Sequence, residues 1–183
     1  MLHGHCYDSR DDELIAMYWR AREVLQAFNG RIDDRNRMTG LRSLLVGVES
    51  DVWIEPPFFC EYGAHIQIGS GSYLNVNCFL QDCANISIGR NVLVGPGVQI
   101  CTASHPVKSS ERIGEGNSYV TSAKPVKIGD RVWIGANVSV LGGVTIGDDV
   151  VIGSGSVVTR DIPSGVVAYG VPCKPQQIIA ANP

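Results

Sequence analysis

The stretch Ile128–Pro163, IGDRVWIGANVSVLGGVTIGDDVVIGSGSVVTRDIP, decides the fold, because an aliphatic residue returns at every sixth position. The first positions of its six consecutive hexads are Ile128, Ile134, Val140, Ile146, Ile152 and Val158. Four positions further on stand Val132, Val138, Val144, Val150, Ser156 and Ile162. A repeat this short buries its apolar face only against its neighbours, so the stretch predicts a solenoid.

Each hexad fits one side of a coil, because six residues are too few for a pair of helices. The aliphatic first residue points inward, and Gly, Asn and Asp suit the corners. Three sides make one turn of an all-β solenoid, a parallel β-helix. The register extends back to Ile88 and Ile68. The likeness of AHIQIG (64–69) to ANISIG (84–89), 20 residues apart, indicates turns with two extra residues.

The period breaks at His105. The following 22 residues, 106–127, lie outside it and predict one long excursion loop thrown out from a corner, with His105 at its base. Long loops in a compact domain are uncommon and often functional.

The N-terminal segment has helical periodicity instead. One helical stripe carries Leu14, Met17, Tyr18, Ala21, Val24, Leu25 and Phe28. Ser9 is a candidate N-cap for this helix, and Gly30 is its expected end. A second helix is predicted over 34–48. The expected organisation is an N-terminal helical cap (1–47), a β-helix (48–170) and a C-terminal tail (171–183).

Composition limits the possible partners. The net charge is -3, and no basic run is interleaved with aromatic residues, which argues against nucleic acid and anionic membranes. The segment MLHGHCYDSRDDEL lacks the apolar core of a signal peptide, and no run is long enough to span a membrane, so a cytoplasmic location is expected. The six cysteines form no C-x-x-C pair, which disfavours a zinc ribbon or a dithiol redox motif.

Four phrases carry a family resemblance: IEPPFFCEYGAHIQIG (54–69), TASHPV (102–107), the hexad run, and AYGVPCKP (168–175). The chain resembles the hexapeptide-repeat acyltransferases, specifically the maltose and galactoside O-acetyltransferase group. The resemblance implies a left-handed β-helix assembled as a homotrimer, with each active site between two subunits and acetyl-CoA as co-substrate. Handedness rests on the resemblance alone, since right-handed crossovers are the usual rule.

Acetyl transfer to a sugar hydroxyl needs a base, because an alcohol attacks a thioester poorly until its proton is withdrawn. A histidine is partly neutral at pH 7 and suits this task. His105 is therefore the predicted catalytic base, and a backbone N–H near the thioester is expected to stabilise the oxyanion.

The resemblance also places the binding positions. The acceptor-binding positions fall on Ser9, Glu61, Asn75, Asp82 and Cys83, where polar groups can bind hydroxyls of a sugar acceptor. Of these, Ser9, Glu61 and Cys83 depart from the residues common in the family. The CoA-binding positions fall on Trp133, Ala136, Ser154, Thr159, Arg160 and Lys174. Arg160 and Lys174 suit phosphate groups.

Three alternatives remain. A metal-dependent carbonic anhydrase of the same fold needs three histidines around its metal, but only His65 and His105 lie in the coil, so no metal site is predicted. The acceptor can also be an antibiotic, serine or an amino sugar on a glycan precursor. Lastly, the coil can be a scaffold without activity, although a scaffold has no evident need for a histidine at an excursion.

Overall fold

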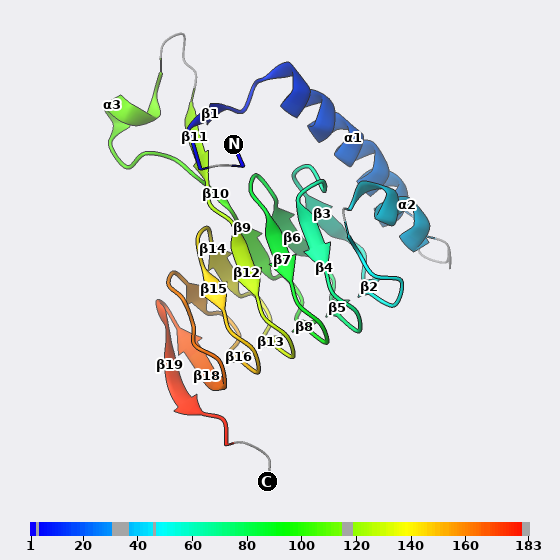
Figure 1. Cartoon of the computed structure of the whole chain (residues 1–183). Coiled ribbons are helices and arrows are strands. Elements are labelled where there is room, and N and C mark those ends of the chain that lie inside the picture. The colour runs from blue at the N-terminus through cyan, green and yellow to red at the C-terminus, as the bar shows by residue number, and fades with distance from the viewer. Residues whose placement is uncertain (3, 31–36, 46, 115–118, 181–183) are drawn as a thin grey trace.

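The computed structural model describes residues 1–2, 4–30, 37–45, 47–114 and 119–180. The chain forms a parallel β-solenoid with helices at one end and a narrow arm that rises from one corner (Figure 1). The helices are α1 (Asp12–Asn29), α2 (Arg37–Leu44) and the short α3 (Ser109–Arg112). The predicted all-β solenoid is confirmed.

Three sheets form the sides of the coil, and successive turns add strands to each. The seven-stranded sheet contains β2 (Trp53–Ile54), β5 (Tyr73–Leu74), β8 (Leu93–Val94), β13 (Trp133–Ile134), β16 (Val151–Ile152), β18 (Val166–Gly170) and β19 (Cys173–Ile178). The five-stranded sheet contains β3 (Phe58–Cys60), β6 (Cys78–Gln81), β9 (Gln99–Cys101), β14 (Ser139–Leu141) and β17 (Val157–Val158). The four-stranded sheet contains β4 (Ile66–Ile68), β7 (Ile86–Ile88), β12 (Val126–Ile128) and β15 (Thr145–Ile146).

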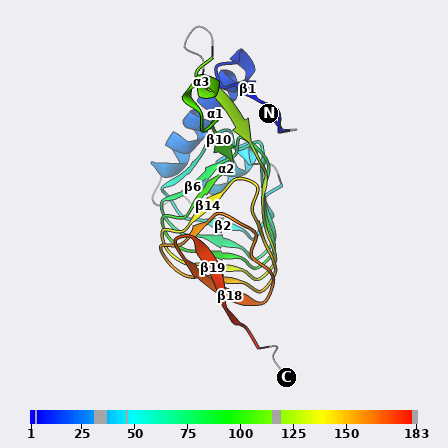
Figure 2. The ribbon, with the colours of Figure 1, turned by 90° about the vertical axis from the view of Figure 1, so that its left-hand side faces the viewer.

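The register of the strands follows the hexads. Residues 18 positions apart pair in parallel and are buried, as in Ile128 with Ile146, Ile134 with Ile152, and Val140 with Val158. In the first turns Ile66 pairs with Ile86, which confirms the 20-residue spacing. Figure 2 shows the turns one behind another, with β18 and β19 in front. The core is thus a stack of inward aliphatic side chains.

The helical cap covers the first turn of the coil. Leu25, Phe28 and Leu41 are buried in the same apolar cluster as Ile54. Arg22 also joins the cap to the coil, because its Nη2 donates to the carbonyl oxygen of Cys60 at 2.5 Å. The helical cap therefore closes this end of the solenoid.

The bounds of the cap helices differ from those expected. Helix α1 begins one residue after Asp11, whose side chain accepts from Glu13 N at 3.0 Å, so the cap is Asp11 and not Ser9. Ser9 instead follows a short strand. Gly30 ends the helix as predicted. The second helix is shorter than 34–48, and positions 34–36 and 46 lie outside the described residues.

The excursion has its own strands. Strand β10 (Ala103–Ser104) pairs antiparallel with β11 (Val120–Ala123), and the N-terminal β1 (Tyr7–Asp8) pairs with the other edge of β11. The stretch predicted as a loop over 106–127 thus contains α3, β11 and the start of β12, while 115–118 lie outside the described residues. Cross-strand pairing, which no hexad pattern signals, accounts for the difference.

At the far end, strand β19 runs antiparallel to β18. The segment 171–183, expected as a tail, therefore contributes a strand, and 181–183 lie outside the described residues. Within the part of the chain that the structure describes, no helix is long and apolar enough to cross a membrane.

Candidate active site

One corner of the coil gathers every insertion into the regular turn. In a regular turn, the inward residues on the two sides that flank this corner are six positions apart in the sequence, as in Val140 and Ile146. The corresponding residues in the second turn, Leu80–Ile88, are eight positions apart, and in the third turn, Ile100–Ile128, they are 28 apart. The extra residues of successive turns therefore stack at a single corner, which we call the insertion corner (61–65, 82–85 and 102–125).

His105 stands at this corner, directly after β10. Its Nδ1 lies 2.9 Å from the carbonyl oxygen of Val120 on β11. A carbonyl can only accept, so Nδ1 carries the hydrogen and the neutral ring keeps its lone pair on Nε2. The side chain is exposed in the single chain. The ring is thus fixed in the tautomer that a general base requires.

The N-terminal strand reaches the same corner. Tyr7 of β1 is paired with Thr121, and Asp8 with Val120, the residue whose carbonyl binds His105. Burial, together with a hydrogen bond to Cys83, raises the pKa of the Tyr7 phenol well above its usual value. Ser9 follows β1 directly and is exposed. The structure therefore places Ser9 beside the β10–β11 arm.

A pocket of about 330 Å³ lies at the foot of the arm. Its lining contains the predicted CoA position Thr159, and it contains Ser104, the neighbour of His105, but not His105 itself. The complete lining is Cys101, Thr102, Ala103, Ser104, Ser122, Ala123, Lys124, Leu141, Gly142 and Thr159. The pocket is therefore lined by both polar and apolar residues, and its lining includes the residue directly before the catalytic candidate.

Asp82 is wholly buried at the insertion corner. Its Oδ1 accepts from the backbone N–H groups of Glu61 and Tyr62 at 3.0 and 2.8 Å, and its Oδ2 accepts from that of His65 at 3.2 Å. His65 also donates from Nδ1 to the Asp82 carbonyl oxygen at 2.7 Å. A carboxylate so enclosed has no free face for a ligand, and it holds the backbone of the preceding turn.

Glu61 and Cys83 lie near Asp82 with perturbed pKa values. Burial raises the pKa of Glu61, and the charge of Asp82 adds to this effect, while Arg22 opposes it. Cys83 is buried, which raises its pKa to about 11, so at neutral pH it is a thiol. Of the two, only the half-buried Glu61 retains access to solvent.

Asn75 lies at a different corner. It follows β5, at the turn toward β6, and its Oδ1 accepts from Val76 N at 2.8 Å. The insertion corner lies one side further along, after β6 and β9. Within one chain, Asn75 and His105 therefore stand at separate corners.

The predicted CoA positions lie at four places. Ala136 and Ser154 stack in successive turns at the Asn75 corner, where Ala136 N donates to Ser154 Oγ at 3.1 Å. Trp133 is 56% exposed on the outer face of the seven-stranded sheet. Thr159 and Arg160 follow β17 at the insertion corner, and Lys174 lies on β19, exposed like Arg160. One chain brings Thr159, but not Asn75 or Ala136, to the corner of His105.

Sequence reasoning missed three members of this site. The carbonyl of Val120 is a backbone group, which no residue type signals. Tyr7 carries no motif that signals it, and Lys124 lies within the stretch predicted as a loop, although its place at the return of the excursion is visible in the sequence. Among the described residues, no group of three or more His, Cys, Asp or Glu side chains is placed to hold a metal ion.

The chain matches two families. Residues 125–160 match the family described as bacterial transferase hexapeptide (six repeats), and residues 1–48 match the maltose acetyltransferase hexapeptide capping motif. The galactoside O-acetyltransferase of Escherichia coli (strain K12) is 39% identical over 160 residues, which cover 85% of this chain and 75% of that protein.

Two solved structures are closely similar. A maltose O-acetyltransferase from Clostridium difficile 630 superposes with a TM-score of 0.93 at 38% identity, covering 98% of this chain and 95% of that one. A hexapeptide-repeat acetyltransferase from Vibrio cholerae O1 biovar eltor, complexed with acetyl coenzyme A, superposes with a TM-score of 0.88 at 36% identity, covering 99% and 97%. With this fold, cap and likeness over nearly its whole length, the chain belongs to the hexapeptide-repeat acetyltransferases, in the maltose and galactoside O-acetyltransferase group.

Proposed function

We propose that the protein transfers the acetyl group of acetyl-CoA to a hydroxyl of a sugar acceptor, with His105 as the general base. The observation that carries this proposal is the hydrogen bond from His105 Nδ1 to the Val120 carbonyl oxygen, which leaves Nε2 free to accept a proton. The acetyl-CoA complex of the Vibrio cholerae relative supports the choice of donor, and the galactoside O-acetyltransferase relative supports a sugar acceptor.

In the proposed reaction, the acceptor oxygen bonds to the acetyl carbonyl carbon while its proton moves to Nε2 of His105. The C–S bond of the thioester then breaks, and the proton on Nε2 goes to the departing sulfur. The products are the acetyl ester and free CoA thiol, and His105 is neutral again. A positioned base of this kind contributes about 10²–10⁴-fold to the rate.

The exposure of the side chains supports an assignment of the binding residues. We assign direct acceptor contacts to Ser9, Glu61 and Asn75, whose side chains reach solvent, while the buried Asp82 and Cys83 shape the corner behind them. The acetyl-CoA contacts are assigned to Thr159 in the pocket and, along the coil, to Trp133, Ala136, Ser154, Arg160 and Lys174.

The proposed active unit is a homotrimer. Because Asn75 and His105 stand at separate corners of one chain, a site that uses both takes Asn75 from one copy and His105 from the next. Mixing an Asn75→Ala variant with a His105→Ala variant, after dissociation and reassembly, should restore part of the activity, since some mixed sites carry both native residues. No recovery from a demonstrably mixed assembly contradicts the shared site.

The decisive experiment measures release of free CoA thiol from acetyl-CoA in the presence of an acceptor panel. The panel contains maltose, a galactoside, an amino sugar, serine and a hydroxyl-bearing antibiotic, so that each alternative acceptor is represented. Release with a sugar by the native protein, and its loss in His105→Ala, is the expected result. Folded protein that releases no thiol with any hydroxyl compound would leave the scaffold interpretation standing.

A further inference from the structure

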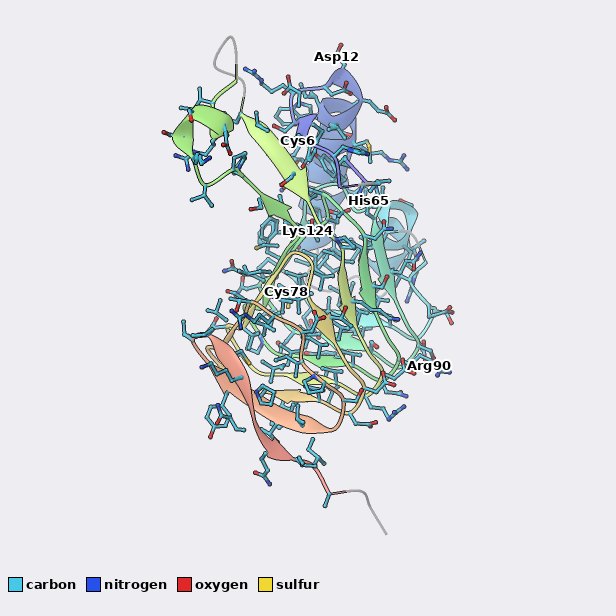
Figure 3. The ribbon with its side chains drawn as sticks, turned by 60° about the vertical axis from the view of Figure 1, so that its left-hand side comes forward. Cys6, Asp12, His65, Cys78, Arg90 and Lys124 are labelled. Carbon is cyan, nitrogen blue, oxygen red and sulfur yellow. The ribbon has the colours of Figure 1, made fainter. Side chains whose placement is uncertain are left out.

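The pocket at the foot of the arm contains a single charged side chain, that of Lys124. The other lining residues are small, apolar or hydroxylated. Lys124 is labelled in Figure 3 where the arm meets the coil. Among the residues that the structure describes, no carboxylate forms an ion pair with its ammonium group. The positive charge of this lining residue is therefore not neutralised by a carboxylate of the described chain.

Lys124 and His105 stand at opposite ends of one strand ladder. Lys124 N donates to the carbonyl oxygen of Thr102 at 3.0 Å, and the next pairs along the arm are Ala103 with Ala123 and Ser104 with Ser122. His105 follows Ser104. The level of Lys124 is therefore three residue steps from that of His105, a distance of roughly 10 Å between main chains. The side chains of Lys124 and His105 can therefore both approach a reacting group that is bound between their two positions along the strand.

Two glycines lie where the arm returns to the coil. A Cβ on Gly142 would lie 2.6 Å from the Thr102 carbonyl oxygen, so only glycine permits this close approach of the coil to the arm. Gly143 has φ +92°, and a Cβ there would lie 3.2 Å from Cδ of Lys124. The stem of Lys124 thus lies over Gly143, and its course is set by the packing of the coil.

We propose that the Lys124 ammonium group contacts the sulfur of CoA and stabilises it as the thiolate. This inference rests on the proposed function and adds to it the residue that faces the leaving group. When the C–S bond breaks, its electron pair stays on the sulfur, which is negatively charged until Nε2 of His105 returns the proton. A fixed cation beside that sulfur favours the step, since preorganised charge acts where charge develops. The net reaction is unchanged.

The direct test needs no acceptor. An opposite charge within about 4–6 Å lowers the pKa of an acid by about 1–3. The pKa of enzyme-bound CoA thiol is measured from thiolate ultraviolet absorbance against pH, after subtraction of the same protein saturated with S-methyl-CoA. We expect this pKa to be lower in the native protein than in Lys124→Met, and Lys124→Arg to retain most of the difference.

Lys127 provides the matched control. It is an exposed lysine three residues further on, in β12, and it does not line the pocket. Lys127→Met should leave the thiol pKa at its native value. With an acceptor found by the panel, Lys124→Met should lower kcat about 10- to 100-fold while the KM for acetyl-CoA stays within about twofold.

The outcomes separate the two proposals. Lys124→Met that binds CoA with the native thiol pKa overturns the role of Lys124 and leaves the proposed function intact. A raised KM for acetyl-CoA with unchanged kcat in Lys124→Met would also overturn this role, because Lys124 would then bind a phosphate group of CoA. If the native protein binds neither CoA nor S-methyl-CoA in calorimetry, the proposed function fails, and this inference fails with it.

Discussion

His105 hydrogen-bonds to the main-chain carbonyl of Val120, 15 residues further along the chain, and this bond joins the two sides of the arm where the base is held. Because the acceptor is a backbone group, a substitution of Val120 leaves the bond in place. The orientation of the ring therefore depends on the pairing of β10, β11 and β1.

His105→Asn should separate geometry from chemistry. The asparagine amide nitrogen stands near the place of Nδ1 and can still donate to Val120, but the side chain has no base. We expect turnover to fall about 10²–10⁴-fold with an unchanged unfolding temperature. His65→Asn is the matched control, since His65 also donates from Nδ1 to a carbonyl, and it should keep native turnover. Retention of more than about a tenth of native turnover by His105→Asn would refute the assignment.

Asp82→Ala should destabilise the protein through the insertion corner. Three backbone N–H groups, of which that of Tyr62 is buried, lose their charged acceptor, at a cost of about 3 kcal/mol in the free energy of unfolding. Asp51→Ala is the control, because Asp51 also accepts from the next turn, from Ser70 Oγ and Gly71 N, but is exposed. Chemical denaturation should give the larger loss for Asp82. Equal losses would mean that burial of the carboxylate is irrelevant.

Glu61→Gln should make stability less dependent on pH. Burial raises the pKa of Glu61 in the folded chain, so the folded state binds more protons than the unfolded state between the ordinary and the raised value. The contribution of protonated Glu61 to stability is fully present below the ordinary pKa of glutamate. It is lost as the pH rises through the raised pKa of the folded state. The variant should therefore unfold at a higher temperature than the native protein at pH 7 and at a similar temperature at pH 4. A native advantage at pH 7 would contradict the sign.

Cysteine alkylation should follow burial. Burial raises the pKa values of Cys78 and Cys83 to about 11 and that of Cys60 further, whereas Cys6 is exposed. The thiolate is the reactive form, so iodoacetamide at pH 8 should label Cys6 first. Mass spectrometry of the folded and the urea-unfolded protein would show this order. Rapid labelling of Cys83 in the folded state would mean that β1 leaves the insertion corner often.

The coil was predictable because its cause is local. In the regular turns an inward aliphatic residue such as Ile134 recurs 18 residues later, and its pairing with Ile152 follows from that spacing alone. The place of His105 was predictable for the complementary reason, since the pattern stops there. Both predictions depend on neighbours along the chain.

The arm was not predictable because its contacts join segments with no common period. Strand β1 meets β11 across more than a hundred residues, and the two pair through backbone groups that no residue type signals. The role of Asp82 was also not predictable, because it depends on burial. A carboxylate suits an acceptor site, but here three backbone N–H groups of the preceding turn donate to it. The position of Lys124 depends on two glycines of the coil. Gly142 allows the arm to approach the coil closely, and Gly143 lies against the Lys124 side chain.

The direction of β19 has a consequence for assembly. A solenoid that ended on a parallel strand would offer the next molecule the same register that its own turns use, and such an edge invites polymerisation. Because β19 runs against β18, the last edge of the seven-stranded sheet presents a reversed hydrogen-bonding pattern. Removal of β19 should therefore expose a strand edge at this end and favour association of molecules there, while the helical cap still covers the other end.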